Sequence, residues 1–169
     1  MGSPLLRKNL VTAAATAAGA LTALSFVPAH AAEYSSALKI PGVQYDAPGQ
    51  DSNSCSSGNA DEEYLTVKNY SFHSTINLKG YVVKDATGNR LAFTANHYLQ
   101  PGDYVKLRGG HGTDSDTHNV VYRDNCNFLW NNDKDTIYLY KPSGSRADVH
   151  AYTKRNDDPD GNGYINLHG

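Results

Sequence analysis

After residue 31 the sequence has no long hydrophobic run, and no later segment is apolar enough to cross a bilayer. Helical periodicity is missing too. Outside the N-terminal stretch, no segment of twelve or more residues repeats apolar side chains at the spacing of an amphipathic helix. These two absences argue against a helical bundle and against a helical membrane protein.

Sequence patterns that carry catalysis are also missing. The chain has no Gly-Xaa-Ser-Xaa-Gly nucleophile elbow and no glycine-rich phosphate loop before a helix. A zinc site needs at least three ligands brought together. His111 and His118 only flank an acidic loop, and His73, His97 and His150 are isolated. We therefore interpret these histidines as having no metal role, and we predict that the protein is not an enzyme.

The first 31 residues differ from the rest of the chain. Arg7 and Lys8 form a short basic region, and residues 10–27 are uncharged and rich in Ala, Leu and Val. Small residues then occupy the two positions before Ala32 that a signal peptidase reads. This order predicts a secretory signal peptide at residues 1–31. The alternative is a membrane anchor, but Ala, Thr and Gly make the stretch weakly hydrophobic for a permanent span.

The mature chain is therefore expected to be extracellular, in solution or attached to the cell surface. Without Arg7 and Lys8 it has 13 basic and 17 acidic residues, a net charge of −4. Nucleic-acid binding needs a basic face, and no basic cluster interleaved with aromatic residues is present. We predict no strong nucleic-acid interaction.

The chain has only two cysteines, Cys55 and Cys126. In an exported protein the default interpretation of such a pair is one disulfide bond. It would close a loop of about 72 residues and stabilise the fold by roughly 4 kcal/mol in the chain-entropy model.

Residues 32–152 alternate short strand patterns with turn signals such as Pro101-Gly102, for which we predict a type II turn. Strands are expected at residues 36–40, 64–68, 78–84, 90–94, 104–107, 119–123, 136–140 and 148–152. In segment 136–140 either the aliphatic or the tyrosine face could be buried, because alternation alone does not distinguish them. This pattern predicts an all-β, antiparallel β-sandwich.

Five segments occur in an order that resembles the lamin tail domain family, in its secreted bacterial form. They are Asn59–Asn69, Ile76–Asp85, Leu99–Val105, Trp130–Leu139 and Asp148. The resemblance covers about residues 37–152 and implies an immunoglobulin-like sandwich. It also implies a non-catalytic domain, which in bacteria often accompanies secreted hydrolases. Within these segments we expect Trp130 to pack at the sandwich edge, with ligand stacking as the alternative, and Asp61-Glu62-Glu63 to form a solvated acidic surface.

Residues 153–169 form a polar, Asp/Gly-rich C-terminal tail, expected to lie outside the sandwich. Asp158, Asp160, Asn162 and the carbonyl of Tyr164 fit positions 1, 3, 5 and 7 of a calcium loop. The bidentate Glu of position 12 is replaced by Gly169, and no helix pattern flanks the loop. The sequence therefore predicts either a weak calcium site or a polar tail that binds no ion.

Together these features predict a secreted, non-catalytic binding or scaffolding module. It would meet an extracellular protein, polymer or cell-surface ligand through its loops or edge strands, where tyrosine gives large contact area at low entropic cost. One alternative is a calcium-dependent binding module that uses the C-terminal loop. The other is an accessory to extracellular nucleic-acid processing, which the negative charge disfavours.

Overall fold

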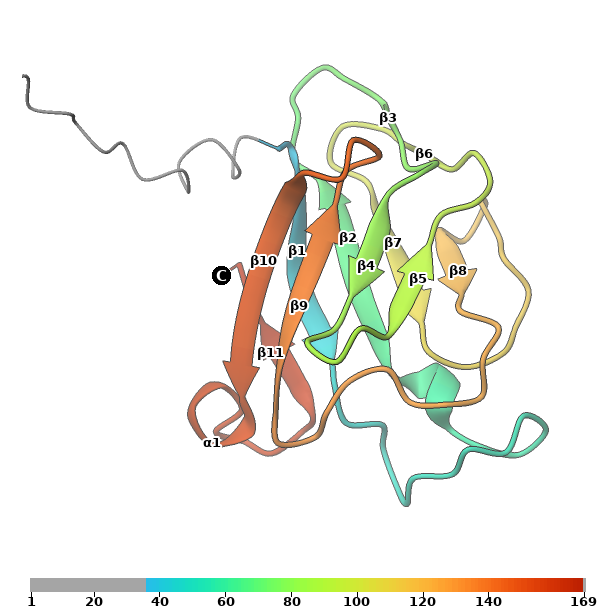
Figure 1. Cartoon of the computed structure of the whole chain (residues 1–169), viewed down its shortest axis with the longest axis vertical. Coiled ribbons are helices and arrows are strands. Elements are labelled where there is room, and N and C mark those ends of the chain that lie inside the picture. Colours follow the sequence, from blue (N-terminus) through green and yellow to red (C-terminus); the bar gives the residue numbers. More distant parts are fainter. Residues whose placement is uncertain (1–35, 169) are drawn as a thin grey trace, which may run out of the picture.

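Two β-sheets pack face to face in the computed structural model, which describes residues 36–168 (Figure 1). The secretory signal predicted for residues 1–31 lies outside the described residues. The first sheet has the order β11 (Tyr164–Asn166), β1 (Leu38–Gln44), β2 (Tyr64–Asn69), β7 (Tyr104–Arg108) and β8 (Val120–Tyr122). The second has the order β10 (Arg146–Thr153), β9 (Lys134–Tyr140), β4 (Val82–Lys84) and β5 (Arg90–Ala92).

Three short elements complete the described part of the chain. They are the β3 (Ile76–Asn77) and β6 (Tyr98–Leu99) pair, the 3-10 turn η1 (Ala60–Glu62) and the single helical turn α1 (Lys154–Asp157). The strand pairs are antiparallel except β7 with β8, which is parallel. The prediction of an all-β, immunoglobulin-like sandwich is confirmed.

The core lies between the two sheets and is built by alternation along each strand. On β2 the side chains of Leu65 and Val67 are fully buried. On β9 the aliphatic face is the buried one, because Ile137 and Leu139 are 0 % exposed while the rings of Tyr138 and Tyr140 stack outside the core. Packing against the second sheet thus decides the question that the sequence pattern left open.

Two turns differ in how they compare with the sequence pattern: one is as predicted, and the other shortens a predicted strand. Asp103 N–H donates to the Gln100 carbonyl (3.0 Å), and Gly102 has φ +85°, as the predicted turn requires. The predicted strand 78–84 begins only at Val82. Gly80 adopts φ +87°, and Tyr81 N–H turns back to the Leu78 carbonyl, so the chain bends there instead of extending.

The C-terminal segment contributes to the sandwich, in contrast to the expectation that it lies outside. β11 pairs with β1, with Val43 opposite Ile165, and Ile165 is buried in the core. A three-residue strand offers one inward side chain, which is too little for alternation to reveal. Within residues 36–168 no helix has the length and hydrophobicity needed to span a bilayer.

The predicted disulfide between Cys55 and Cys126 is present. It joins the loop between β1 and β2 to the loop that follows β8. Trp130 is buried, 4 % exposed, as the packing interpretation expected.

Candidate functional site

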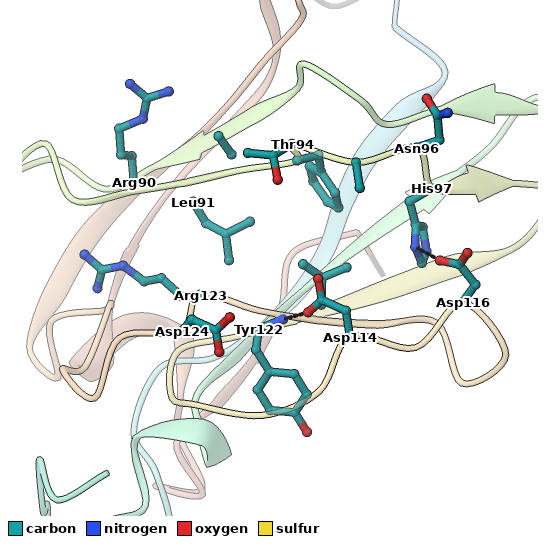
Figure 2. Close-up of a pocket in the computed structure, with 14 residues that line it drawn as sticks. Arg90, Leu91, Thr94, Asn96, His97, Asp114, Asp116, Tyr122, Arg123 and Asp124 are labelled. Atoms are coloured by element: carbon teal, nitrogen blue, oxygen red, sulfur yellow. Dashed lines mark hydrogen bonds and ion pairs between the residues drawn. The ribbon is translucent and has the colours of Figure 1, made fainter.

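A groove opens along one side of the sandwich, where the edge strands β5 and β8 lie in different sheets (Figure 2). Its volume is about 630 Å³. This lies within the range of protein ligand pockets, about 300–1,000 Å³. The apolar part of its lining comes from Leu91, Phe93 and Val121, which are also members of the core. Core packing therefore holds the floor of the groove rigid.

The outer side of β5 is open to a further strand. β5 has β4 as its only neighbour in the described sheet. Phe93 N–H donates to the Tyr81 carbonyl and Asp85 N–H to the Asn89 carbonyl, so residues 89 and 93 face β4. Because these directions alternate along a strand, the backbone groups of Arg90 and Ala92 point away from β4.

The outer side of β8 is already occupied by its own preceding loop. Ser115 and Val120 exchange two backbone hydrogen bonds, of 2.9 and 3.0 Å. Asp114 Oδ1 accepts a hydrogen bond from Tyr122 N–H at 2.8 Å. The groove therefore has one closed wall at β8 and one open strand edge at β5.

Two buried polar atoms of the groove lining have no hydrogen-bond partner among residues 36–168: Arg123 Nη1 and His97 Nε2. They lie toward opposite ends of the groove in Figure 2. The other side of each group is engaged, since Arg123 Nη2 donates to Asn89 Oδ1 (3.3 Å) and His97 Nδ1 pairs with Asp116 Oδ1 (2.7 Å). Burial lowers the pKa of Arg123, and the charges of Asp85 and Glu63 oppose this shift.

Unpaired polar groups are rare in protein interiors because their desolvation is not compensated. The groove lining thus contains an unpaired guanidinium N–H at one end and an unpaired imidazole nitrogen at the other, both buried, with apolar side chains between them. A turn of either side chain toward the groove would let it bond an extended ligand, with an acceptor for Arg123 and a polar group for His97.

Glu63 is buried, so the expectation of a solvated acidic run is wrong for this residue. Its Oε2 accepts hydrogen bonds from Leu129 N–H (2.7 Å) and Trp130 N–H (3.2 Å). Burial raises the pKa of Glu63 to about 8, although these two hydrogen bonds lower it. The carboxyl group connects the start of β2 to the segment before β9 and has a structural role.

Three of the predicted calcium ligands, Asp158, Asp160 and Asn162, lie in the loop between α1 and β11, where their side-chain oxygens accept hydrogen bonds from the protein. The fourth, Tyr164, is the first residue of β11 and lies opposite Gln44 of β1. Asp158 Oδ2 accepts from Tyr45 O–H (2.6 Å) and Gly163 N–H (2.9 Å). The hydrogen bond from Tyr45 is the main cause that lowers the pKa of Asp158.

The two other side chains of this loop interact in the same way. Asp160 Oδ2 accepts from Asn162 Nδ2 (2.8 Å), and Asn162 Oδ1 accepts from Tyr164 N–H (2.7 Å). The calcium site stays a prediction. An ion would have to replace hydrogen bonds that already stabilise the loop.

The interpretation of His150 as an isolated histidine is wrong. The structure brings it together with Asp148, on the same strand, and with His168, near the end of the described chain. The sequence signal was Asp148-Val149-His150, since residues i and i+2 of a strand share a face. His168 could not be associated with them from local sequence.

The tyrosines serve two roles. Tyr45 and Tyr152 are buried and pack ring to ring in the core, with centroids 5.0 Å apart. Large exposed aromatic side chains are found instead in the β2–β3 loop, on β6 and at the start of β7: Tyr70, Phe72, Tyr98 and Tyr104. The tyrosine content therefore reflects core packing as well as available contact surface.

Comparison with known proteins supplies one match. No curated protein matches the chain. The family model described as Lamin Tail Domain matches residues 31–154, which is most of the chain. That family has an immunoglobulin-like, non-enzymatic fold, in agreement with the two packed sheets described above. The chain therefore belongs to the lamin tail domain family.

Proposed function

We propose that this protein is a lamin tail domain of the secreted bacterial type, which works outside the cell as a non-catalytic binding module. Its ligand is an extended peptide segment of a partner protein, held in the groove between β5 and β8. Export is supported by the signal-peptide pattern of residues 1–31 and by the Cys55–Cys126 disulfide, a bond that persists in oxidising compartments.

The peptide class follows from the open edge of β5. An extended peptide can add to such an edge as a further strand, and its main-chain hydrogen bonds then supply affinity. Arg90 and Ala92 direct their backbone groups to that side, as the pairing of β5 with β4 requires. Alternate peptide side chains would enter the groove and contact the floor at Leu91, Phe93 and Val121.

The unpaired Nη1 of Arg123 is the observation that carries the proposal. Once the Arg123 side chain turns toward the groove, a carboxylate or main-chain carbonyl of the peptide would accept its hydrogen bond and supply the missing partner. Hydrogen bonds to a charged group contribute about 1.5–3 kcal/mol, so a partner with an acidic side chain at this end is preferred.

The test is selection from a phage library of linear peptides, with affinities of the selected peptides measured by calorimetry. We expect Arg123→Met to weaken binding at least tenfold. Ala92→Pro should do the same, because proline removes a backbone N–H that faces the open edge but makes no bond to β4. The matched control is Arg155→Met, since Arg155 is exposed on α1 at the opposite side of the sandwich (Figure 1).

Thermal unfolding of each variant first shows that the fold is intact. The proposal fails if no peptide is enriched over a blank surface. It also fails if the enriched peptides bind the folded Arg123→Met and Ala92→Pro variants as tightly as the parent protein.

A further inference from the structure

Three side chains converge at the edge of the sandwich formed by β10 and β11, and none of them lines the groove. His150 Nε2 lies 3.0 Å from His168 Nε2 and 3.2 Å from Asp148 Oδ2. His168 Nε2 lies 3.4 Å from the same Asp148 oxygen. These three atoms therefore form a nearly equilateral triangle.

The size of this triangle matches a tetrahedral metal site. Zinc binds imidazole nitrogen and carboxylate oxygen at about 2.0–2.1 Å, which places neighbouring tetrahedral ligands about 3.3 Å apart. The three measured separations, 3.0, 3.2 and 3.4 Å, lie close to that value. An ion would sit slightly above the triangle and within bonding distance of all three atoms.

A purely hydrogen-bonded cluster explains the contacts less completely. Asp148 Oδ2 already accepts Ile40 N–H at 2.8 Å. The two Nε2 atoms at 3.0 Å cannot both direct a proton at one another, so a proton on one nitrogen leaves the other with a lone pair. If both imidazoles carry their proton on Nδ1, three lone pairs face the same point, an arrangement that a cation stabilises.

The ligand-bearing segments are held in place by β1. Ile40 N–H fixes the carboxylate of Asp148, and Lys39 Nζ lies 3.4 Å from its other oxygen. The segment that carries His168 is held by β1 as well, because Leu167 N–H donates to the Pro41 carbonyl at 2.8 Å. Such hydrogen bonds around the ligands orient them and reduce the cost of assembling the site.

Access to the cluster is one-sided. The Asp148 side chain is 2 % exposed, His150 19 % and His168 35 %. An ion would thus have the carboxylate on its buried side and solvent on the other. The nearby Lys39 ammonium offsets the charge of Asp148, so we expect moderate affinity.

We propose that Asp148, His150 and His168 form a zinc-type site, with a fourth position open to water or to a ligand from outside. Two imidazoles and one carboxylate suit zinc and similar divalent transition metals, whereas calcium prefers oxygen ligands alone. Bound metal would connect β10 of the second sheet to the segment following β11 of the first. It would act as a clamp at the edge of the sandwich opposite the groove (Figure 1).

The test uses the protein without a histidine tag, stripped with EDTA and titrated with zinc chloride by calorimetry. We expect saturable one-to-one binding and a rise of several degrees in the melting temperature. Cobalt(II) should give the intense visible bands of a four-coordinate site. Calcium chloride at the same concentrations should leave the melting temperature unchanged if this cluster is the site.

The discriminating variants are His150→Ala and His168→Ala, and His73→Ala is the control because His73 is exposed in another loop. Each ligand variant should weaken zinc binding at least tenfold, while the control keeps the parent affinity. His168 lies near the chain end, so its replacement leaves the core intact. Absence of one-to-one binding, or equal affinity in His168→Ala and the parent, would overturn the proposal.

Discussion

At the scale of single residues, Glu63 shows how a charged side chain can serve as a structural element. Its carboxyl group is fully buried and accepts two backbone hydrogen bonds, while its other oxygen has no partner within the described chain. The acidic run Asp61-Glu62-Glu63 gives no local sign of this, because neither the residue types nor their spacing distinguish the buried member from its exposed neighbour Glu62.

The raised pKa of Glu63 predicts how stability depends on pH. The folded pKa is about 8 and the ordinary value is 4.5, so between these values the unfolded chain loses a proton that the folded protein keeps. The free energy of unfolding should therefore fall as pH rises from about 4.5 to about 8. Glu63→Gln should remove this fall and be more stable than the parent by roughly 2–4 kcal/mol at pH 8. Urea denaturation at pH 5 and pH 8 measures both effects.

Glu62→Gln is the matched control and should follow the parent protein at both pH values, because Glu62 is exposed. Glu63→Ala should instead be destabilised by about 1–3 kcal/mol at pH 5, since it leaves the N–H groups of Leu129 and Trp130 without an acceptor. Parallel pH profiles for the parent and Glu63→Gln would contradict this account.

At the scale of secondary-structure elements, the loop between α1 and β11 decides whether the C-terminal segment joins the sandwich. Asp158 accepts the hydroxyl of Tyr45 and two loop N–H groups, those of Asn162 and Gly163. These bonds close the loop so that Ile165 reaches the core beside Val43. The carboxylate of Asp158 thus helps to position β11, together with the pairing of β11 with β1.

Asp158→Asn should destabilise the protein by about 1–3 kcal/mol, because the amide group cannot accept on both sides. Asp160→Asn is the control and should change stability little, since Asp160 is exposed and accepts its hydrogen bond from the exposed side chain of Asn162. Thermal unfolding followed by circular dichroism measures both variants. Equal melting temperatures for the two variants would show that Asp158 does not hold the loop.

The same two variants address the predicted calcium site. If the loop binds calcium, the melting temperature of the parent should rise only at millimolar concentrations, the range of weak extracellular sites, and Asp160→Asn should lose the rise. Because the side-chain oxygens already accept hydrogen bonds, we expect no tighter binding. A micromolar affinity would contradict that expectation.

At the scale of the whole molecule, the proposed peptide groove and the proposed metal site occupy opposite edges of one sandwich (Figure 1). The groove lies at β5 and β8, and the histidine cluster lies at β10 and β11. The core lies between the two sites and contains buried residues from both sheets. Because the two sites share no residue, a negative result for one proposal does not affect the other.

The disulfide is the covalent constraint on the whole fold. Cys55 and Cys126 are 71 residues apart in sequence, and the bond joins two loops at one end of the molecule. Replacing both with serine should lower the free energy of unfolding by roughly 2–4 kcal/mol, because the unfolded chain regains the entropy of an open loop. Urea denaturation with and without dithiothreitol measures this effect.

The double variant should be insensitive to the reductant, whereas the parent should approach the stability of the variant when reduced. If reduction of the parent, verified by thiol titration, leaves its denaturation midpoint unchanged, the disulfide contributes nothing to stability. Arg123 lies three residues before Cys126, so peptide binding should also be measured in the double variant.

The sequence by itself determined the sandwich, because strand alternation and turns are set by near neighbours in the chain. Leu65 and Val67 mark an inward face within one strand, and Pro101-Gly102 specifies its turn. The disulfide was also predictable, because the chain has only two cysteines and is expected to be exported to an oxidising compartment.

Only the tertiary structure decided the sites. His97 pairs with Asp116, and Asp148 lies beside His168, which is 20 positions away, because the fold places these distant segments side by side. The burial of Glu63 and the open edge of β5 likewise depend on which elements pack beside them. Local patterns record which face of a strand is apolar, whereas the meeting of distant polar side chains is determined by strand order and packing.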